Sequence, residues 1–119
     1  MKKHILRKNE DFNKIIKEGK RSSCSHFIVY SLPSLFFKDD THRVGISVGK
    51  KLGNAVVRNS QKRRVRAIVR ELEKEQLFAK NDYVIISKVK CLNSSYTMQL
   101  KSLKSLLIKE LRWKKYYYF

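Results

Sequence analysis

The sequence predicts an α+β fold in which helices pack on a small mixed sheet, and three observations support this prediction. Along the 119 residues, the hydrophobic patterns follow the order helix, strand, strand, helix, strand, helix. Residues 43–49 alternate between β-branched side chains and small or charged ones, which indicates a strand. Residues 55–77 repeat apolar side chains at helical spacing, and a helix of this length between two strands lets those strands pair in parallel.

The first third of the chain is expected to form one helix and one strand. Asn9 can cap a helix that carries acids in its first turn and has Phe12 and Ile16 on its apolar face. Residues 20–25 are polar, so we predict a turn there. Residues 27–32 are rich in strand-forming residues, and a proline ends the predicted strand.

The predicted strand at residues 43–49 has two different faces. Val44, Ile46 and Val48 point to one face, which we expect to be buried. The opposite face carries small residues such as Gly45, which leaves room for another backbone or a ligand to approach closely.

The second half of the chain predicts two longer helices around a third strand. Asn54 is the expected cap of the helix at residues 55–77, whose core stripe is Val65, Ile68, Val69 and Leu72. Asn81 and Asp82 predict a turn, and residues 83–87 are apolar enough for a central strand. A last helix at residues 95–114 is expected to bury Leu100, Leu103, Leu107 and Leu111.

Length and composition indicate a single RNA-binding domain covering residues 1–119. The chain has 28 basic and 10 acidic residues, a formal net charge of +18, and enough hydrophobic residues (42%) for a core, which disordered basic tails lack. Its two cysteines, Cys24 and Cys91, have no metal-binding spacing, and we expect them to be reduced thiols. Neither a signal peptide nor a membrane span is evident, so we expect a soluble, cytoplasmic protein.

The segment at residues 50–66 is the strongest functional signal. It holds seven of the 28 basic residues and no acid, so its charge cannot be neutralised within the segment. A polyphosphate backbone is the partner that such a charge density indicates. At about 100° per residue, Lys62, Arg66, Arg70 and Arg63 fall within one arc of about 100° beside the apolar stripe. The candidate RNA-binding residues are Lys50, Lys51, Asn54, Arg58, Asn59, Lys62, Arg63 and Arg66.

The plain alternative is that these cations form an ordinary solvated helix face. The absence of acids from residue 50 to residue 70, the overall charge and the clustering on one arc argue against it. Arginine also presents a planar fork that suits phosphate oxygens, and the amide groups at the start of the helix can bind a phosphate.

The acidic residues do not indicate a nuclease site, because two-metal catalysis needs several converging carboxylates. The densest acidic group, Asp39-Asp40-Thr41-His42, is interpreted as a solvated loop, and His4 and His26 as surface or strand residues. We therefore predict no catalytic residue and no metal ligand in the chain.

The sequence resembles a known family, the protein component of bacterial ribonuclease P. The resemblance is carried by the run Lys-Leu-Gly-Asn-Ala-Val-Val-Arg-Asn at residues 51–59 with the cations that follow it, by Leu-Arg-Lys-Asn-Glu-Asp-Phe at residues 6–12, and by the strand at residues 43–48. It covers at least residues 6–87.

The resemblance implies a fold with about four strands and three helices, and a left-handed β-α-β crossover against the usual right-handed rule. It implies that the protein binds the ribonuclease P RNA, with one protein per RNA. Together they remove the 5′ leader of precursor tRNA, the RNA performing the Mg²⁺-dependent hydrolysis. It also implies a cleft for the leader between sheet and helix, to which Phe12, Ile16 and Tyr30 correspond.

Two departures from the family pattern stand out. The core triplet is typically Arg-Asn-Arg, whereas here it reads Arg58-Asn59-Ser60, and we expect Arg63, Arg64 and Arg66 to substitute in part. Ile16 stands where an aromatic residue is common, which predicts a weaker grip on the leader.

Two alternative functions are a small basic ribosomal protein and an autonomous metal-dependent nuclease.

Overall fold

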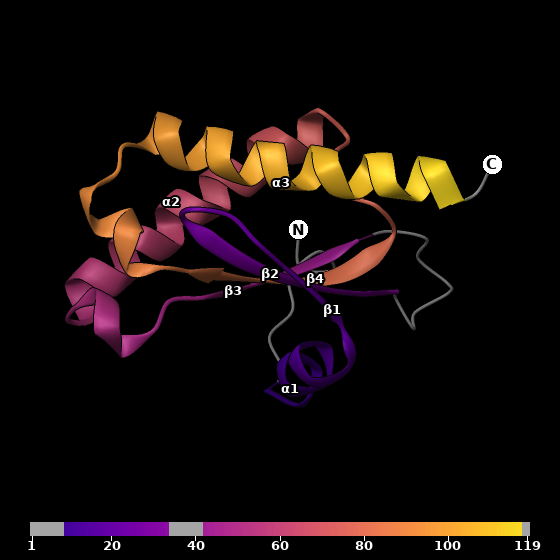
Figure 1. The fold of residues 1–119 in the computed structure, drawn as a ribbon. Coiled ribbons are helices and arrows are strands. Elements are labelled where there is room, and N and C mark those ends of the chain that lie inside the picture. The colour runs from indigo at the N-terminus through magenta and orange to yellow at the C-terminus, as the bar shows by residue number, and fades with distance from the viewer. Residues whose placement is uncertain (1–8, 34–41, 118–119) are drawn as a thin grey trace.

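The computed structural model describes the backbone of residues 9–33 and 42–117 and the side chains of residues 10–33 and 42–111. It consists of three α-helices, a four-stranded sheet and two short 3₁₀ helices (Figure 1). The elements in chain order are α1 (Asn9–Glu18), β1 (Lys20–Ser23), β2 (Phe27–Pro33), β3 (Arg43–Ser47), η2 (Lys50–Leu52), α2 (Ala55–Lys74), β4 (Asn81–Ser87), η3 (Val89–Asn93) and α3 (Tyr96–Tyr117).

The sheet has the strand order β1-β2-β4-β3, with α2 and α3 on one face and α1 on the other (Figure 1). The pairs β1–β2 and β2–β4 are antiparallel, whereas β3 and β4 are parallel and are joined by α2. The predicted α+β class, the mixed sheet and the parallel pairing across the long helix are therefore confirmed. The handedness of the β3–α2–β4 crossover stays a prediction of the resemblance.

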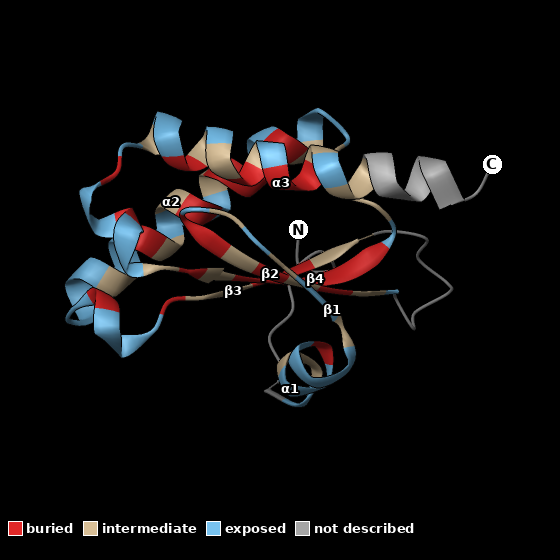
Figure 2. Ribbon diagram, in the orientation of Figure 1, coloured by how far each residue is buried: buried red, intermediate tan, exposed pale blue. Residues whose placement is uncertain are grey.

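The main core lies between the sheet and the layer formed by α2 and α3 (Figure 2). The predicted stripe of α2 is buried in full, and Leu103 and Leu107 of α3 are buried beside it. These side chains pack against the face of the sheet that carries Phe27 and Val44, whereas Leu100 and Leu111 are only partly buried. The helical and strand periodicities thus identified the buried faces correctly.

Two sequence predictions about the sheet are wrong. The polar segment predicted as a turn contains β1, a strand at the edge of the sheet whose backbone pairs with β2. Asn81 and Asp82 begin β4 instead of forming a turn, and both are buried. The Asp82 carboxylate accepts two hydrogen bonds from the Arg43 guanidinium, which allows it to be buried. In both places backbone pairing or a charged partner overrides the polarity of the side chains.

The last predicted helix begins one residue later than expected, and α2 ends at Lys74 rather than at residue 77. The end of α2 follows from Gln76, which has a φ of 57° and therefore turns the chain out of the helix. The side chains of Asn9, the expected cap, of Trp113 and of the aromatic residues at positions 116–119 lie outside the described residues, as do His4 and the loop at residues 39–41. None of the described helices is long and apolar enough to cross a membrane.

A buried pair of glutamines fixes α2 against α3. The Gln61 amide group donates to Ser87 Oγ (3.2 Å) and to Gln99 Oε1 (2.8 Å). Gln99 in turn donates to the backbone oxygens of Cys91 (3.2 Å) and Ser94 (3.3 Å). Gln99 is fully buried, so these hydrogen bonds take the place of the ones that its side chain would form with water. The network ties the first half of α2, where the candidate site lies, to β4, η3 and α3.

We expect Gln99→Leu to lower the free energy of unfolding by about 2 kcal/mol or more, because it removes buried hydrogen bonds to the Gln61 side chain and to the backbone oxygens of Cys91 and Ser94. Urea unfolding followed by circular dichroism measures the change. Met98→Leu, at an exposed neighbouring position, is the control and should have little effect. Equal stability of the two variants would contradict a stabilising role for the network.

Candidate nucleic-acid interface

The start of α2 is held by local interactions that the sequence encodes. Asn54 has an extended backbone and its side chain accepts a hydrogen bond from the Val57 amide (3.1 Å), which confirms the predicted cap. Gly53 has a φ of 137°, which only glycine adopts without strain, and it connects η2 to this cap. Lys50 and Lys51 of η2 are both exposed beside it. The loop and the helix start thus present cations and free amide groups together.

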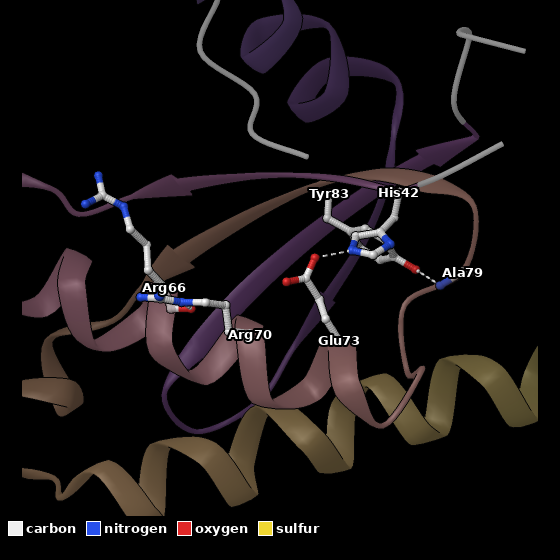
Figure 3. Close-up of polar contacts among 6 residues, drawn as sticks. All are labelled: His42, Arg66, Arg70, Glu73, Ala79 and Tyr83. Atoms are coloured by element: carbon white, nitrogen blue, oxygen red, sulfur yellow. Dashed lines mark hydrogen bonds and ion pairs between the residues drawn. The ribbon is translucent and has the colours of Figure 1, made fainter. Parts of the chain in front are cut away.

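Most cations of α2 lie along one side of the helix, beside its buried stripe. Asn59, Arg63, Arg66 and Arg70 are exposed, and Arg58 and Lys62 are half-buried. Figure 3 shows Arg66 and Arg70 on successive turns of the helix, with the Arg70 Nε donating to the Arg66 backbone oxygen at 3.5 Å. The name basic arc is used below for Lys50, Lys51, Arg58, Asn59, Lys62, Arg63, Arg66 and Arg70.

The charge of the basic arc is not balanced by nearby acids. Among the described residues, side-chain ion pairs join His42 to Glu73, Arg43 to Asp82 and Lys104 to Glu75. None of these pairs includes a residue of the basic arc. Arg58 Nε is buried and has no hydrogen-bond partner in the described part of the chain. The cations are therefore gathered on one side and are not neutralised by described carboxylates, which is the arrangement that a polyanionic ligand requires.

Arg64 does not belong to the basic arc, and its predicted role as a substitute for the missing arginine at position 60 is not supported by its contacts. Its guanidinium donates to the Ser94 backbone oxygen at 3.1 Å, on the side of α2 that faces α3. Arg64 thus holds η3 and the start of α3 in place. Arg63 and Arg66 remain exposed.

The three predicted leader-cleft residues lie on the opposite face of the sheet, where α1 packs. Phe12 lies directly over Gly45, because a Cβ added at Gly45 would come within 2.4 Å of the Phe12 ring. Phe12 and Tyr30 pack around buried Ile15 and Val84, and Tyr30 is only half-buried. The open face expected at Gly45 is therefore filled in part by an aromatic ring.

Ile16 and Arg21 border this aromatic surface. Ile16 is 38% exposed on α1. Arg21 of β1 pairs with Tyr30 of β2, so both side chains lie on the same face of the sheet, and Arg21 is exposed. Sequence reasoning missed Arg21 because the segment was assigned to a turn, which has no defined face. An exposed aliphatic residue, an arginine and a half-buried tyrosine thus surround the accessible part of this face.

Between the two surfaces, His42 and Glu73 connect the start of β3 to α2 (Figure 3). Their side chains meet at 2.5 Å, and the His42 ring stacks on Phe78 with centroids 5.0 Å apart. The Phe78 and Tyr83 rings form a T-shaped pair with centroids 5.2 Å apart, and the Tyr83 hydroxyl accepts a hydrogen bond from the Ala79 amide at 2.9 Å. Burial raises the pKa of Tyr83 to about 12, so this hydroxyl stays protonated.

Two histidine assignments need correction. His42 is not part of a freely solvated loop, because a ring partner and a carboxylate on α2 hold it. His26 is 4% exposed and its Nε2 lies 2.8 Å from Ser94 Oγ, so it is a buried residue in the turn just before β2. Neither belongs to a cluster of metal-binding side chains: the described residues contain no group of three or more that could hold a metal ion.

The fold and these surfaces define a class: a small nucleic-acid-binding α+β protein with a cationic helix face and an aromatic sheet face. Residues 1–111 match the family model described as Ribonuclease P. The ribonuclease P protein component of Bacillus cereus (strain B4264) is 40% identical over 102 residues, which cover 86% of each chain. The chain therefore belongs to the ribonuclease P protein family.

Solved structures agree with this assignment. The ribonuclease P protein of Staphylococcus aureus superposes with a TM-score of 0.77 at 33% identity, covering 90% of this chain and 94% of that one. The protein from Thermotoga maritima gives 0.74 at 33% identity, covering 86% and 93%. The predicted function as an RNA-binding protein component of the tRNA-processing ribonuclease P is confirmed, and the ribosomal alternative is not favoured.

Proposed function

We propose that this protein binds the catalytic RNA of ribonuclease P through the basic arc and holds the 5′ leader of precursor tRNA on the α1 face of the sheet. The RNA subunit, with Mg²⁺, performs the hydrolysis, and one protein serves one RNA in the cytoplasm. The observation that carries the proposal is the basic arc itself, a row of cations on one rigid helix without described acids to neutralise them.

The leader assignment is supported by the shape of the other surface. A single strand can stack its bases on aromatic faces with little sequence preference, and a cation beside the ring can meet its backbone. Tyr30 and Arg21 provide this pair on adjacent strands, and Phe12 extends the surface toward β3. The α1 face therefore suits an unpaired leader better than a duplex.

Four carboxylates of the protein are paired with other side chains of the fold, and this supports assigning the hydrolysis to the RNA. Asp82 is paired with Arg43, Glu73 with His42, and Glu75 with Lys104. The Glu110 carboxylate accepts a hydrogen bond from Ser22. These carboxylates serve the fold, so we assign positioning and electrostatic stabilisation of the RNA to the protein, and the metal-dependent step to the RNA.

The direct test is cleavage of precursor tRNA at low Mg²⁺ by the RNA subunit from the same cells, with and without purified protein. We expect the protein to restore cleavage, because its cations reduce the phosphate repulsion that metal ions otherwise screen. The protein alone, freed of RNA, should leave the substrate intact. Cleavage by the RNA-free protein, or no stimulation, would contradict the proposal.

Single replacement of Arg58, Lys62 or Arg66 by glutamine should weaken binding to the RNA subunit and make it less sensitive to salt. Each lost phosphate contact should reduce the slope of log affinity against log salt by about 0.7–0.9. Filter binding at several salt concentrations measures the slope. The control is Lys104→Gln, whose ammonium already pairs with Glu75 at 2.7 Å. An unchanged slope in all three variants would move the binding surface elsewhere.

Ile16→Phe should strengthen the grip on the leader, because a stacked base contributes about 1–3 kcal/mol. We expect precursor tRNA, but not leaderless tRNA, to bind the variant holoenzyme at least about five-fold more tightly. Ile16→Leu is the control, since it keeps the apolar volume without a ring. Equal affinity of the phenylalanine and leucine variants for precursor tRNA would exclude stacking at this position.

A further inference from the structure

A second cationic surface lies at the opposite edge of the sheet from the basic arc. A concave pocket of about 430 Å³ separates α3 from the turn between β1 and β2. The turn contributes Ser23, Cys24, Ser25 and His26, and α3 contributes Lys101, Ser102, Ser105, Leu106 and Lys109. The hollow is open to solvent and has room for a phosphate group. We call it the α3 pocket.

The α3 side of the pocket is a helical stripe with a cation at each end. Lys101, Ser105 and Lys109 are spaced four residues apart, so they lie on one side of α3, and all three are exposed. The small side chain of Ser105 leaves space between the two ammonium groups. An anionic group seated there is within reach of both lysines and of a hydroxyl donor.

The turn on the other side adds further hydroxyls and is held rigidly. The Cys24 amide donates to the Phe27 oxygen at 2.9 Å, and Lys88 Nζ donates to the Cys24 oxygen at 2.7 Å. The His26 ring is fixed from behind by its 2.8 Å contact with Ser94 Oγ. Within the described chain, no hydrogen bond or ion pair engages the side chains of Ser25 or Lys101. The Ser25 hydroxyl and the Lys101 ammonium group are therefore available to a ligand, and the turn that carries Ser25 is held in place by these hydrogen bonds.

The charge of the α3 pocket comes from its lysines. No carboxylate lines it, and Glu110, the next residue along α3 from Lys109, accepts a hydrogen bond from Ser22. Burial and, to a lesser extent, the nearby Lys90 lower the pKa of His26, which disfavours its charged form. Two ammonium groups and several hydroxyls around an acid-free hollow match the chemistry of a phosphate group.

We propose that the α3 pocket binds a phosphate of the RNA backbone, as a second contact separate from the basic arc. The sheet order places the β1–β2 turn at one edge and β3 at the other. The basic arc ends near Glu73, which contacts His42 just before β3, so the two cationic surfaces lie at opposite edges. The protein thus bridges two RNA segments across its width, a role that rests on the proposed function.

The first experiment titrates inorganic phosphate into the labelled protein and follows amide resonances by NMR. We expect shifts at Ser25, His26, Ser102 and Ser105 that the Lys101→Gln/Lys109→Gln variant loses, whereas shifts near Arg66 persist in it. These lysines are exposed, so the variant keeps its fold, which its remaining spectrum verifies. Unchanged resonances around the pocket at millimolar phosphate would overturn the anion site.

The second experiment identifies the source of the phosphate with the ribonuclease P RNA itself. Lys101→Gln and Lys109→Gln should each reduce the salt slope by about 0.7–0.9, and the double variant should bind roughly ten-fold more weakly at moderate salt. Lys104→Gln on the same helix is the matched control and should leave the slope unchanged. If phosphate binds but RNA affinity does not change, the pocket takes a free anion and the RNA assignment is wrong.

Arg66→Gln separates this inference from the function on which it rests. If Arg66→Gln lowers the slope and the α3 variants do not, the second contact is overturned while the basic arc stands. If neither lowers it, both fail. If Lys104→Gln weakens binding as much as Lys101→Gln, the effect is one of net charge alone and the α3 pocket is not a site.

Discussion

The burial of the apolar stripe of α2 between the sheet and α3 is the interaction on which the rest of the structure depends. Val65, Ile68 and Leu72 are fully buried, so the rotation of the helix about its axis is fixed. Burying such a side chain contributes about 1.5–3 kcal/mol, and turning the helix would expose the stripe. The same rotation determines where the cations point: the positions that cannot enter the core carry the basic arc. Packing of apolar residues therefore sets the direction of the charges.

The distribution of charge explains why the protein and its RNA suit each other energetically. With a formal net charge of +18, the compact chain is destabilised by repulsion among its own cations. The described acids relieve this only locally, where Arg43 meets Asp82 and Lys104 meets Glu75. A polyanion that binds the folded chain removes more of the repulsion and adds its binding free energy to stability. The buried glutamine pair, in contrast, holds α2 to α3 without adding charge, so the cationic helix remains fixed in the absence of RNA.

The sequence correctly predicts the elements whose apolar side chains repeat at helical or strand spacing. It does not predict structure that depends on backbone pairing or on contacts between residues far apart in the chain. The α2 cap, its buried stripe and the parallel pairing across it follow from local pattern and connection length. β1 could not be seen, because an edge strand of polar residues is defined by its backbone bonds to β2. Asp82 was assigned to a turn because its partner, Arg43, is 39 residues away. His42 was assigned to solvent for the same reason, since Phe78 and Glu73 approach it only in the folded chain. The position of Phe12 over Gly45 was accessible in part, because a small residue in a strand indicates a close approach.

The serine at position 60 shows how the fold limits compensation within the basic helix. At about 100° per residue, Arg64 lies only about 40° around the helix from position 60 and would be its natural substitute. Its guanidinium, however, donates to the Ser94 oxygen and helps to hold η3 and α3, so a contact with RNA would break that bond. Arg63 lies about 60° away in the other direction and is exposed. The nearest exposed cation to this departure is therefore Arg63, because the guanidinium of the nearer arginine is engaged with the Ser94 oxygen. Which donors of a basic side chain are already engaged within the protein is a property of the folded chain, and sequence position alone does not give it.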